Sequence, residues 1–106
     1  MTAELDELQR WYLAQCDGDW EHEFGVRIET LDNPGWSLEV NLEGTALEGI
    51  PFAPVEDMAP ERDWIRYVVL EGKFDAVGGP LMLRQMIRTF LDWARQAPAS
   101  PSNGAA

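Results

Sequence analysis

Residues 2–16 place apolar side chains at steps of three and four, which is the period of an α-helix with one buried face. Thr2 is a candidate N-cap, and carboxylates occupy the first turn, where they interact favourably with the helix dipole. Trp11 lies beside the apolar stripe and widens it, so the pattern predicts an amphipathic helix that packs onto a sheet. The stripe consists of Leu5, Leu8, Tyr12 and Gln15 or Cys16.

From Phe24 onward the apolar period changes to two, which is typical of a β-strand with one buried face. Two such runs flank Asn33-Pro34-Gly35, where Pro presets φ at one central turn position and Gly permits positive φ at the next. The pattern therefore predicts a β-hairpin. Its apolar positions are Phe24, Val26 and Ile28 in the first strand and Trp36, Leu38, Val40 and Leu42 in the second.

The second half of the chain repeats the strand signal and then changes to a helical one. Residues 44–63 hold three Pro and two Gly without a sustained period, so we expect a long connection there. Residues 64–71 and 74–77 are expected to form a third and a fourth strand. Pro80 suits the first turn of a helix that extends to about Gln96. The apolar face of this helix is Leu83, Met86, Ile87, Phe90, Leu91 and Ala94.

This order of elements predicts an α+β fold with a small antiparallel four-stranded sheet. The N-terminal and C-terminal helices are expected to pack on one face of the sheet, in the order α-β-β-β-β-α. Residues 1–97 are expected to form a single domain, because 106 residues suffice for one hydrophobic core and are too few for two. The composition of residues 98–106 predicts a disordered tail.

The charge of the chain narrows the classes of partner. The formal net charge is −11, which argues against unaided contact with nucleic-acid phosphates or anionic membranes. Residues 1–63 hold 16 acidic and 3 basic side chains, whereas residues 64–106 hold 3 and 5. The sequence therefore predicts a basic or neutral partner for the N-terminal part. A single cysteine and an acidic N-terminus without a long apolar run predict a cytoplasmic protein.

The run CDGDWEHE at residues 16–23 gathers the reactive residue types, including the single cysteine and the single histidine. Cys16 with His22 could act as a nucleophile and base. However, Asp17 and Asp19 raise the pKa of a neighbouring thiol, and Cys16 ends an apolar stripe. We therefore expect Cys16 to be a buried structural residue.

Metal binding by the same run is weighed against known ligand patterns. Asp17, Asp19 and Glu21 copy the first three ligands of a calcium loop, but His22 stands where that loop needs its glycine and Ile28 where it needs its glutamate. One Cys and one His are too few for a typical zinc site. No phosphate-binding glycine motif is present. The sequence predicts no metal and no cofactor.

Two tryptophans stand next to turns. Trp20 lies between acidic residues, where an interface anchor and a core residue are equally compatible with the pattern. Trp36 opens a strand directly after the hairpin turn, and core packing is the favoured role for it.

Three motifs occur in order along the chain: W-Y-x-x-Q-C-D-G-D-W-E-H at residues 11–22, T-L-D-N-P-G-W at 30–36 and G-G-P at 78–80. In combination, over roughly residues 5–96, they resemble the immunity protein 53 family of bacterial polymorphic toxin systems. The tail after Ala97 departs from the pattern. The resemblance implies a small cytoplasmic protein, encoded beside a secreted toxin, that binds the toxin domain and blocks it.

The preferred hypothesis is a non-enzymatic immunity protein whose acidic surface faces a basic, nuclease-like toxin domain. The alternatives are a small Cys/His-dependent enzyme of thiol or sulfur transfer, and a homodimeric module that uses the hairpin edge. The pattern leaves monomer and homodimer open. The hypothetical toxin-binding residues are Asp17, Asp19, Trp20, Glu21, His22, Glu23, Glu29, Glu39 and Glu43.

Overall fold

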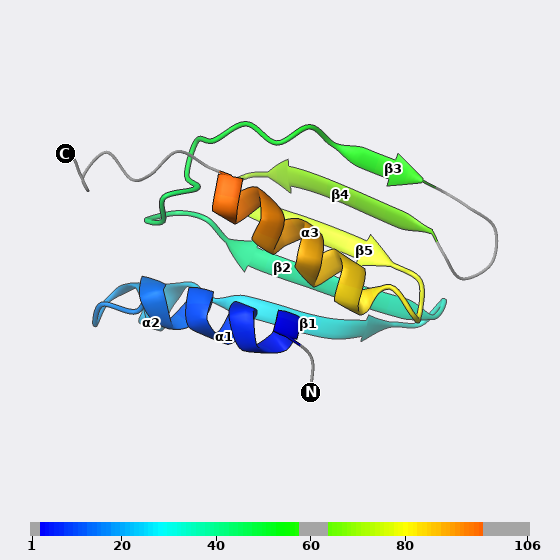
Figure 1. The fold of residues 1–106 in the computed structure, drawn as a ribbon, viewed down its shortest axis with the longest axis horizontal. Helices are drawn as coiled ribbons and strands as arrows, with labels where there is room; N and C mark the ends of the chain where they lie inside the picture. The colour runs from blue at the N-terminus through cyan, green and yellow to red at the C-terminus, as the bar shows by residue number, and fades with distance from the viewer. Residues whose placement is uncertain (1–2, 58–63, 97–106) are drawn as a thin grey trace.

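The computed structural model describes residues 3–57 and 64–96 (Figure 1). Five strands form one antiparallel sheet in the order β1-β2-β5-β4-β3. The helices are α1 (Ala3–Gln15), α2 (Trp20–Glu23) and α3 (Leu83–Gln96). The strands are β1 (Val26–Leu31), β2 (Gly35–Asn41), β3 (Val55–Asp57), β4 (Ile65–Leu70) and β5 (Lys73–Gly78).

The α+β class and the two terminal helices are confirmed, but the expectation of four strands is wrong. β3 lies inside the segment that the sequence predicts as a long connection. It spans three residues, all exposed, and Val55 pairs with Tyr67 of β4. Three residues are too few for a period of two to stand out, and Pro54 directly before them favours a loop. The expected tail at residues 98–106 lies outside the described residues.

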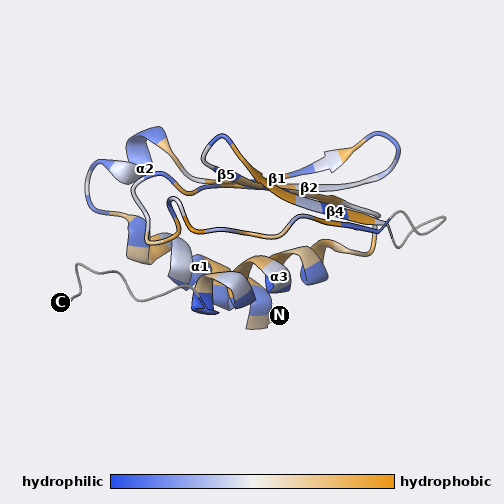
Figure 2. Cartoon of the chain, turned by 90° about the horizontal axis from the view of Figure 1, so that it is seen from above, coloured by the Kyte–Doolittle hydropathy of each residue, from blue (hydrophilic) through white to orange (hydrophobic). Residues whose placement is uncertain are grey.

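Both long helices cover the same face of the sheet, and none of the described helices lies along β2, β5 and β4 on the opposite face (Figure 2). The core lies between these two layers, where strands contribute alternate residues and α3 contributes one stripe. None of the described helices is both long and apolar enough to span a membrane. The largest fully buried side chains are Tyr67, Phe74, Phe90, Leu38, Leu42, Leu47, Met86, Ile87 and Val40.

Ion pairs tie α1 to α3. The Glu4 carboxylate accepts hydrogen bonds from Arg84 Nε at 3.0 Å and from Arg88 Nε at 3.3 Å. Glu7 accepts from Arg88 Nη2 at 2.8 Å and pairs with Arg95. These arginines hold the pKa of Glu7 below its ordinary value, with the Arg88 hydrogen bond as the main cause. These ion pairs therefore attach the N-terminal half of α1 to α3.

This attachment leaves part of the predicted apolar stripe uncovered. Leu8 is buried, but Leu5 and Tyr12 are each 39% exposed. On β1, Ile28 is 37% exposed although its alternation predicts burial. The expectation that these three side chains lie in the core is wrong, because α1 packs against α3 and leaves a groove between itself and β1.

Candidate functional site

The segment from Cys16 to Glu23 forms a closed corner between α1 and β1. The Asp17 Oδ1 atom accepts hydrogen bonds from the backbone N–H groups of Asp19 and Trp20, each at 2.9 Å. In return, the Glu21 carboxylate accepts from the backbone N–H groups of Asp17 and Gly18, also at 2.9 Å. Gly18 has φ of +98°, which a glycine adopts without strain. This reciprocal pattern resembles a capping box and fixes the start of α2.

These backbone contacts stabilise the ionised carboxylates. The N–H groups of Trp20 and Asp19 hold the pKa of Asp17 below its ordinary value of 3.8. The pKa of Glu21 is lowered from 4.5, first by its own backbone N–H and then by those of Asp17 and Gly18. Two of the predicted toxin-binding carboxylates therefore fold the corner.

Trp20 belongs to the core and not to the exposed surface. Its side chain is 5% exposed, and its ring lies 6.2 Å from Trp11 and 6.1 Å from Tyr12 between centroids. Its Nε1 donates to the Glu43 carbonyl oxygen at 2.8 Å. Burial therefore assigns Trp20 to the core, whereas the sequence left a core role and an interface role open. The indole also links the corner to the end of β2.

Besides Asp17, whose carboxylate binds the backbone, four of the predicted residues are exposed together around α2: Asp19, His22, Glu23 and Glu43. We call this set the α2 corner. Asp19, His22 and Glu23 line a hollow of about 340 Å³ that also touches Gly44, next to Glu43. The ion pairs between described residues include no carboxylate of the α2 corner. The α2 corner is therefore a compact negative surface on a fixed backbone.

Glu29 and Glu39 occupy a different surface, the helix-free face of the sheet. Arg27 Nε lies 3.7 Å from Glu29 Oε2, and Arg27 Nη1 lies 3.9 Å from Glu39 Oε1. Lys73 Nζ lies 3.9 Å from Glu39 Oε2. Because these cations offset the two carboxylates, the predicted single acidic surface is divided into an acidic corner and a mixed-charge sheet face.

The sequence reasoning passed over Asn41 and Lys73, which line a second hollow of about 380 Å³ together with His22, Glu23 and Glu39. Asn41 Oδ1 accepts a hydrogen bond from the backbone N–H of Gly25 at 2.9 Å and so fixes the start of β1. Strand alternation places both residues on the same sheet face as Glu39. The alternating pattern of the strands could therefore have predicted that they lie near Glu39.

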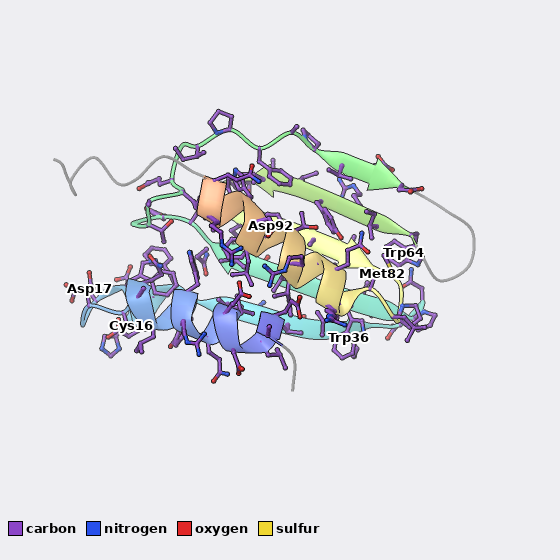
Figure 3. The ribbon with its side chains drawn as sticks, viewed as in Figure 1. Cys16, Asp17, Trp36, Trp64, Met82 and Asp92 are labelled. Atoms are coloured by element: carbon purple, nitrogen blue, oxygen red, sulfur yellow. The ribbon has the colours of Figure 1, made fainter. Side chains whose placement is uncertain are left out.

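Cys16 is half-buried, and its thiol donates to the Tyr12 carbonyl oxygen at 3.4 Å (Figure 3). The Cys16 side chain is also the first cause of a raised pKa of the Tyr12 hydroxyl. His22 lines hollows in which Cys16 takes no part. Within residues 3–57 and 64–96 no group of three or more His, Cys, Asp or Glu side chains is arranged to hold a metal ion.

Comparison with known proteins gives one match. A family model described as immunity protein 53 matches residues 5–95. This range includes all the described helices and strands apart from the first two residues of α1 and the last residue of α3. No curated protein and no solved structure matches.

Proposed function

This chain belongs to the immunity protein 53 family, and from that premise we propose that it binds a cognate polymorphic toxin in the bacterial cytoplasm and neutralises it. The α2 corner is the contact surface in this proposal, and a basic region of the toxin domain faces it. The proposal treats the protein as an inhibitor without catalytic activity of its own.

The observation that carries this assignment is the grouping of exposed carboxylates on a backbone that is already fixed. Asp19, Glu23 and Glu43 keep their charge toward solvent, while Asp17 and Glu21 hold the backbone beneath them. A prearranged negative surface loses little conformational entropy on binding and speeds encounter with a basic partner.

The test uses the toxin domain encoded beside the gene for this chain. The variant Asp19→Lys, Glu23→Lys, Glu43→Lys should weaken toxin binding about 100-fold in calorimetry, because three interface carboxylates become repulsive. It should also abolish protection in a growth assay with the toxin expressed. Its melting temperature should stay near that of the wild type, since these side chains are exposed.

A matched control carries the same change in charge on other surfaces: Asp32→Lys, Glu56→Lys, Asp57→Lys. These exposed residues lie in the hairpin turn and on β3. The control should bind the toxin far more tightly than the corner variant. Equal weakening by both variants would contradict the surface assignment, and failure of the wild-type chain to bind the toxin would contradict the proposed function.

A further inference from the structure

Within the described residues, the sheet has one protected edge and one open edge, on whose outer side none of the described strands pairs. β3 forms the protected edge with only three residues, whereas β1 presents six residues and keeps an unbroken register with β2. Four of the six β1 residues are exposed. Soluble proteins usually protect a long edge strand with charged side chains, Pro or a bulge, because its free backbone groups can pair with another strand. The strand Val26–Leu31 has no Pro and no bulge, and its two charged residues, Arg27 and Glu29, have opposite signs.

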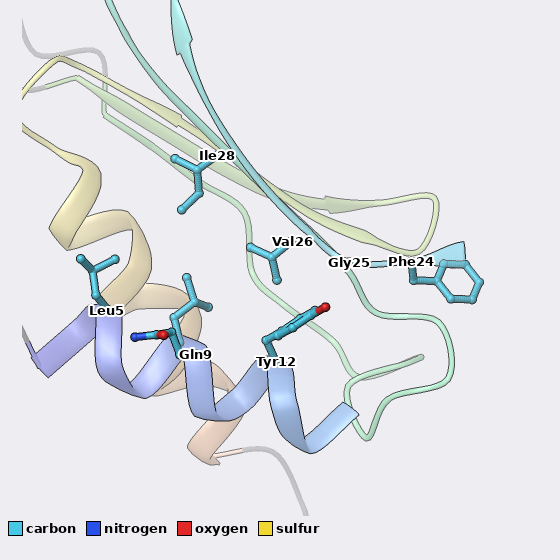
Figure 4. Close-up of a pocket in the computed structure, with 8 residues that line it drawn as sticks. Leu5, Gln9, Tyr12, Phe24, Gly25, Val26 and Ile28 are labelled. Atoms are coloured by element: carbon cyan, nitrogen blue, oxygen red, sulfur yellow. The ribbon is translucent and has the colours of Figure 1, made fainter. Parts of the chain in front are cut away.

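An apolar groove of about 460 Å³ runs along this open edge, between α1 and β1 (Figure 4). Leu5 and Tyr12 line it from the helix, and Val26 and Ile28 line it from the strand. The sequence pattern of both elements predicts buried side chains, yet the folded chain leaves Tyr12 and Ile28 partly exposed. A second surface that covers them would remove apolar area from water.

The hydrogen-bond ladder determines which β1 residues can pair outward. Asn41 N donates to Gly25 O at 3.1 Å, so the odd-numbered residues of β1 exchange hydrogen bonds with β2. Leu42 N donates to Gly72 O at 2.8 Å, which assigns the even-numbered residues of β2 to β5 and agrees with this alternation. The backbone N–H and C=O groups of Val26, Ile28 and Thr30 therefore point outward in the plane of the sheet, on the side of β1 opposite β2.

Charge then selects one register for pairing between two β1 strands. An antiparallel pair centred on Arg27 would place Arg27 opposite its own copy, and one centred on Glu29 would place Glu29 opposite its own copy. A pair centred on Ile28 places Arg27 of each chain opposite Glu29 of the other. Opposite charges directly across a strand pair stabilise it and like charges destabilise it. This centre also joins all three outward-pointing residues.

We propose that the open edge of β1 binds a second copy of this chain, antiparallel and two-fold symmetric about Ile28. The two five-stranded sheets then form one continuous sheet of ten strands. Val26 pairs with Thr30 of the other copy, and the two Ile28 side chains meet beside the groove. The helices of both copies lie on one face of this sheet, and each α2 corner lies before the start of its own β1 strand, beside the hairpin turn of the other copy.

The first measurement is the molar mass of the full chain in solution. Sedimentation equilibrium should give twice the 12.0 kDa of one chain, with a dissociation constant below about 0.1 mM. Because each chain carries a net charge of −11, added salt should favour the dimer by screening the overall repulsion. A monomer at chain concentrations well above about 0.1 mM, with and without salt, overturns the proposal.

Two variants locate the interface. Glu29→Arg should raise the dissociation constant about tenfold or more, because both ion pairs across the axis become repulsive. Ile28→Pro should also disrupt the dimer, because it removes the N–H that pairs with the second copy. The single chain should still fold, because this N–H makes no hydrogen bond within its own sheet. Glu43→Arg carries the same charge change as Glu29→Arg and should leave the dimer intact. A dimer that withstands both β1 variants overturns the proposal.

A charge swap between Arg27 and Glu29 tests the register itself. The single variants Arg27→Glu and Glu29→Arg should each dimerise more weakly than the wild type, because each would oppose like charges. The double variant Arg27→Glu, Glu29→Arg should dimerise again, since both ion pairs about Ile28 are then restored with reversed sign, whereas a pair centred on Arg27 or on Glu29 would still oppose like charges. The melting temperature of each variant is measured first, because Arg27 also pairs with Glu29 and Glu39 in its own chain. A folded double variant that associates as weakly as the single variants overturns the Ile28-centred register.

Discussion

Neighbouring carboxylates in the corner have different roles. Asp17 and Glu21 accept backbone hydrogen bonds, while Asp19 begins α2 without a side-chain capping bond. The residue types alone suggest one acidic cluster, and only the hydrogen bonds separate carboxylates that fold the chain from one that is available to a partner.

We expect Asp17→Ala and Glu21→Ala each to lower the melting temperature, because backbone N–H groups lose their acceptor. Asp19→Ala, in the same corner, should leave the melting temperature close to that of the wild type. Thermal unfolding followed by circular dichroism at pH 7 checks this. The distinction between the carboxylates is wrong if all three variants melt alike.

The same contacts predict a sensitivity to acid. Because the folded chain lowers the pKa of Asp17 and of Glu21 below 3.8 and 4.5, their contribution to stability is complete above these ordinary values. It is lost as the pH falls through the lowered values, where the folded carboxylates take up protons. In urea titrations across this range, wild type should lose more stability than the double variant Asp17→Ala, Glu21→Ala.

Gly35 is required at the hairpin for a reason of space, and the expectation of a positive φ there is wrong, because Gly35 is the first residue of β2. A Cβ at this position would overlap the Gly78 carbonyl oxygen and lie 3.2 Å from the Trp64 ring. Figure 3 shows Trp64 at the hairpin end of the sheet. Gly35→Ala should destabilise the protein by about 1–3 kcal/mol through overpacking. Gly25→Ala is the control, because nothing lies within 4 Å of a Cβ there. Equal free energies of unfolding in urea would contradict this explanation.

At the level of elements, α1 depends on α3 more than on the sheet. Arg88 is central to this contact, because its guanidinium reaches Glu4, Glu7 and Asp92. The Glu4 carboxylate is largely enclosed, so loss of its cations would leave a poorly solvated charge.

Arg88→Ala should therefore lower the melting temperature and increase amide hydrogen exchange in α1 more than in β4 and β5. Arg10→Ala, at an exposed position of α1, is the control and should change neither quantity much. Exchange that increases evenly over the described elements would show that the ion pairs do not attach α1 locally.

At the level of the whole molecule, the charge is distributed unevenly. The acidic excess lies in residues 1–63, which include the α2 corner, whereas α3 directs arginines toward α1. A field of this kind acts on a partner before contact is made.

The rate of association with the proposed toxin should therefore fall as salt concentration rises, while the dissociation rate changes little. Stopped-flow or surface binding kinetics at several ionic strengths check this. The α2 corner variant should show a weaker dependence on salt than the Asp32, Glu56 and Asp57 control. An association rate that is independent of salt would contradict electrostatic steering.

The α+β class, both long helices, the first hairpin and the family could be predicted from the residues alone, because they depend on local periods, turn residues and ordered motifs. The sequence also identified the buried positions of β2 and α3, where the pattern and the burial agree. The short strand β3 escaped it, since three residues carry no measurable period.

The roles of the side chains of the run CDGDWEHE in folding, and the exposure of one apolar stripe, could be seen only in the folded chain. Hydrogen bonds join Asp17 to Trp20 and Glu21 to Gly18, and packing buries Trp20. The position of α1 against α3 leaves Ile28 uncovered at a sheet edge. These outcomes depend on contacts between segments and on competition for one core, which residue types and spacing do not encode locally.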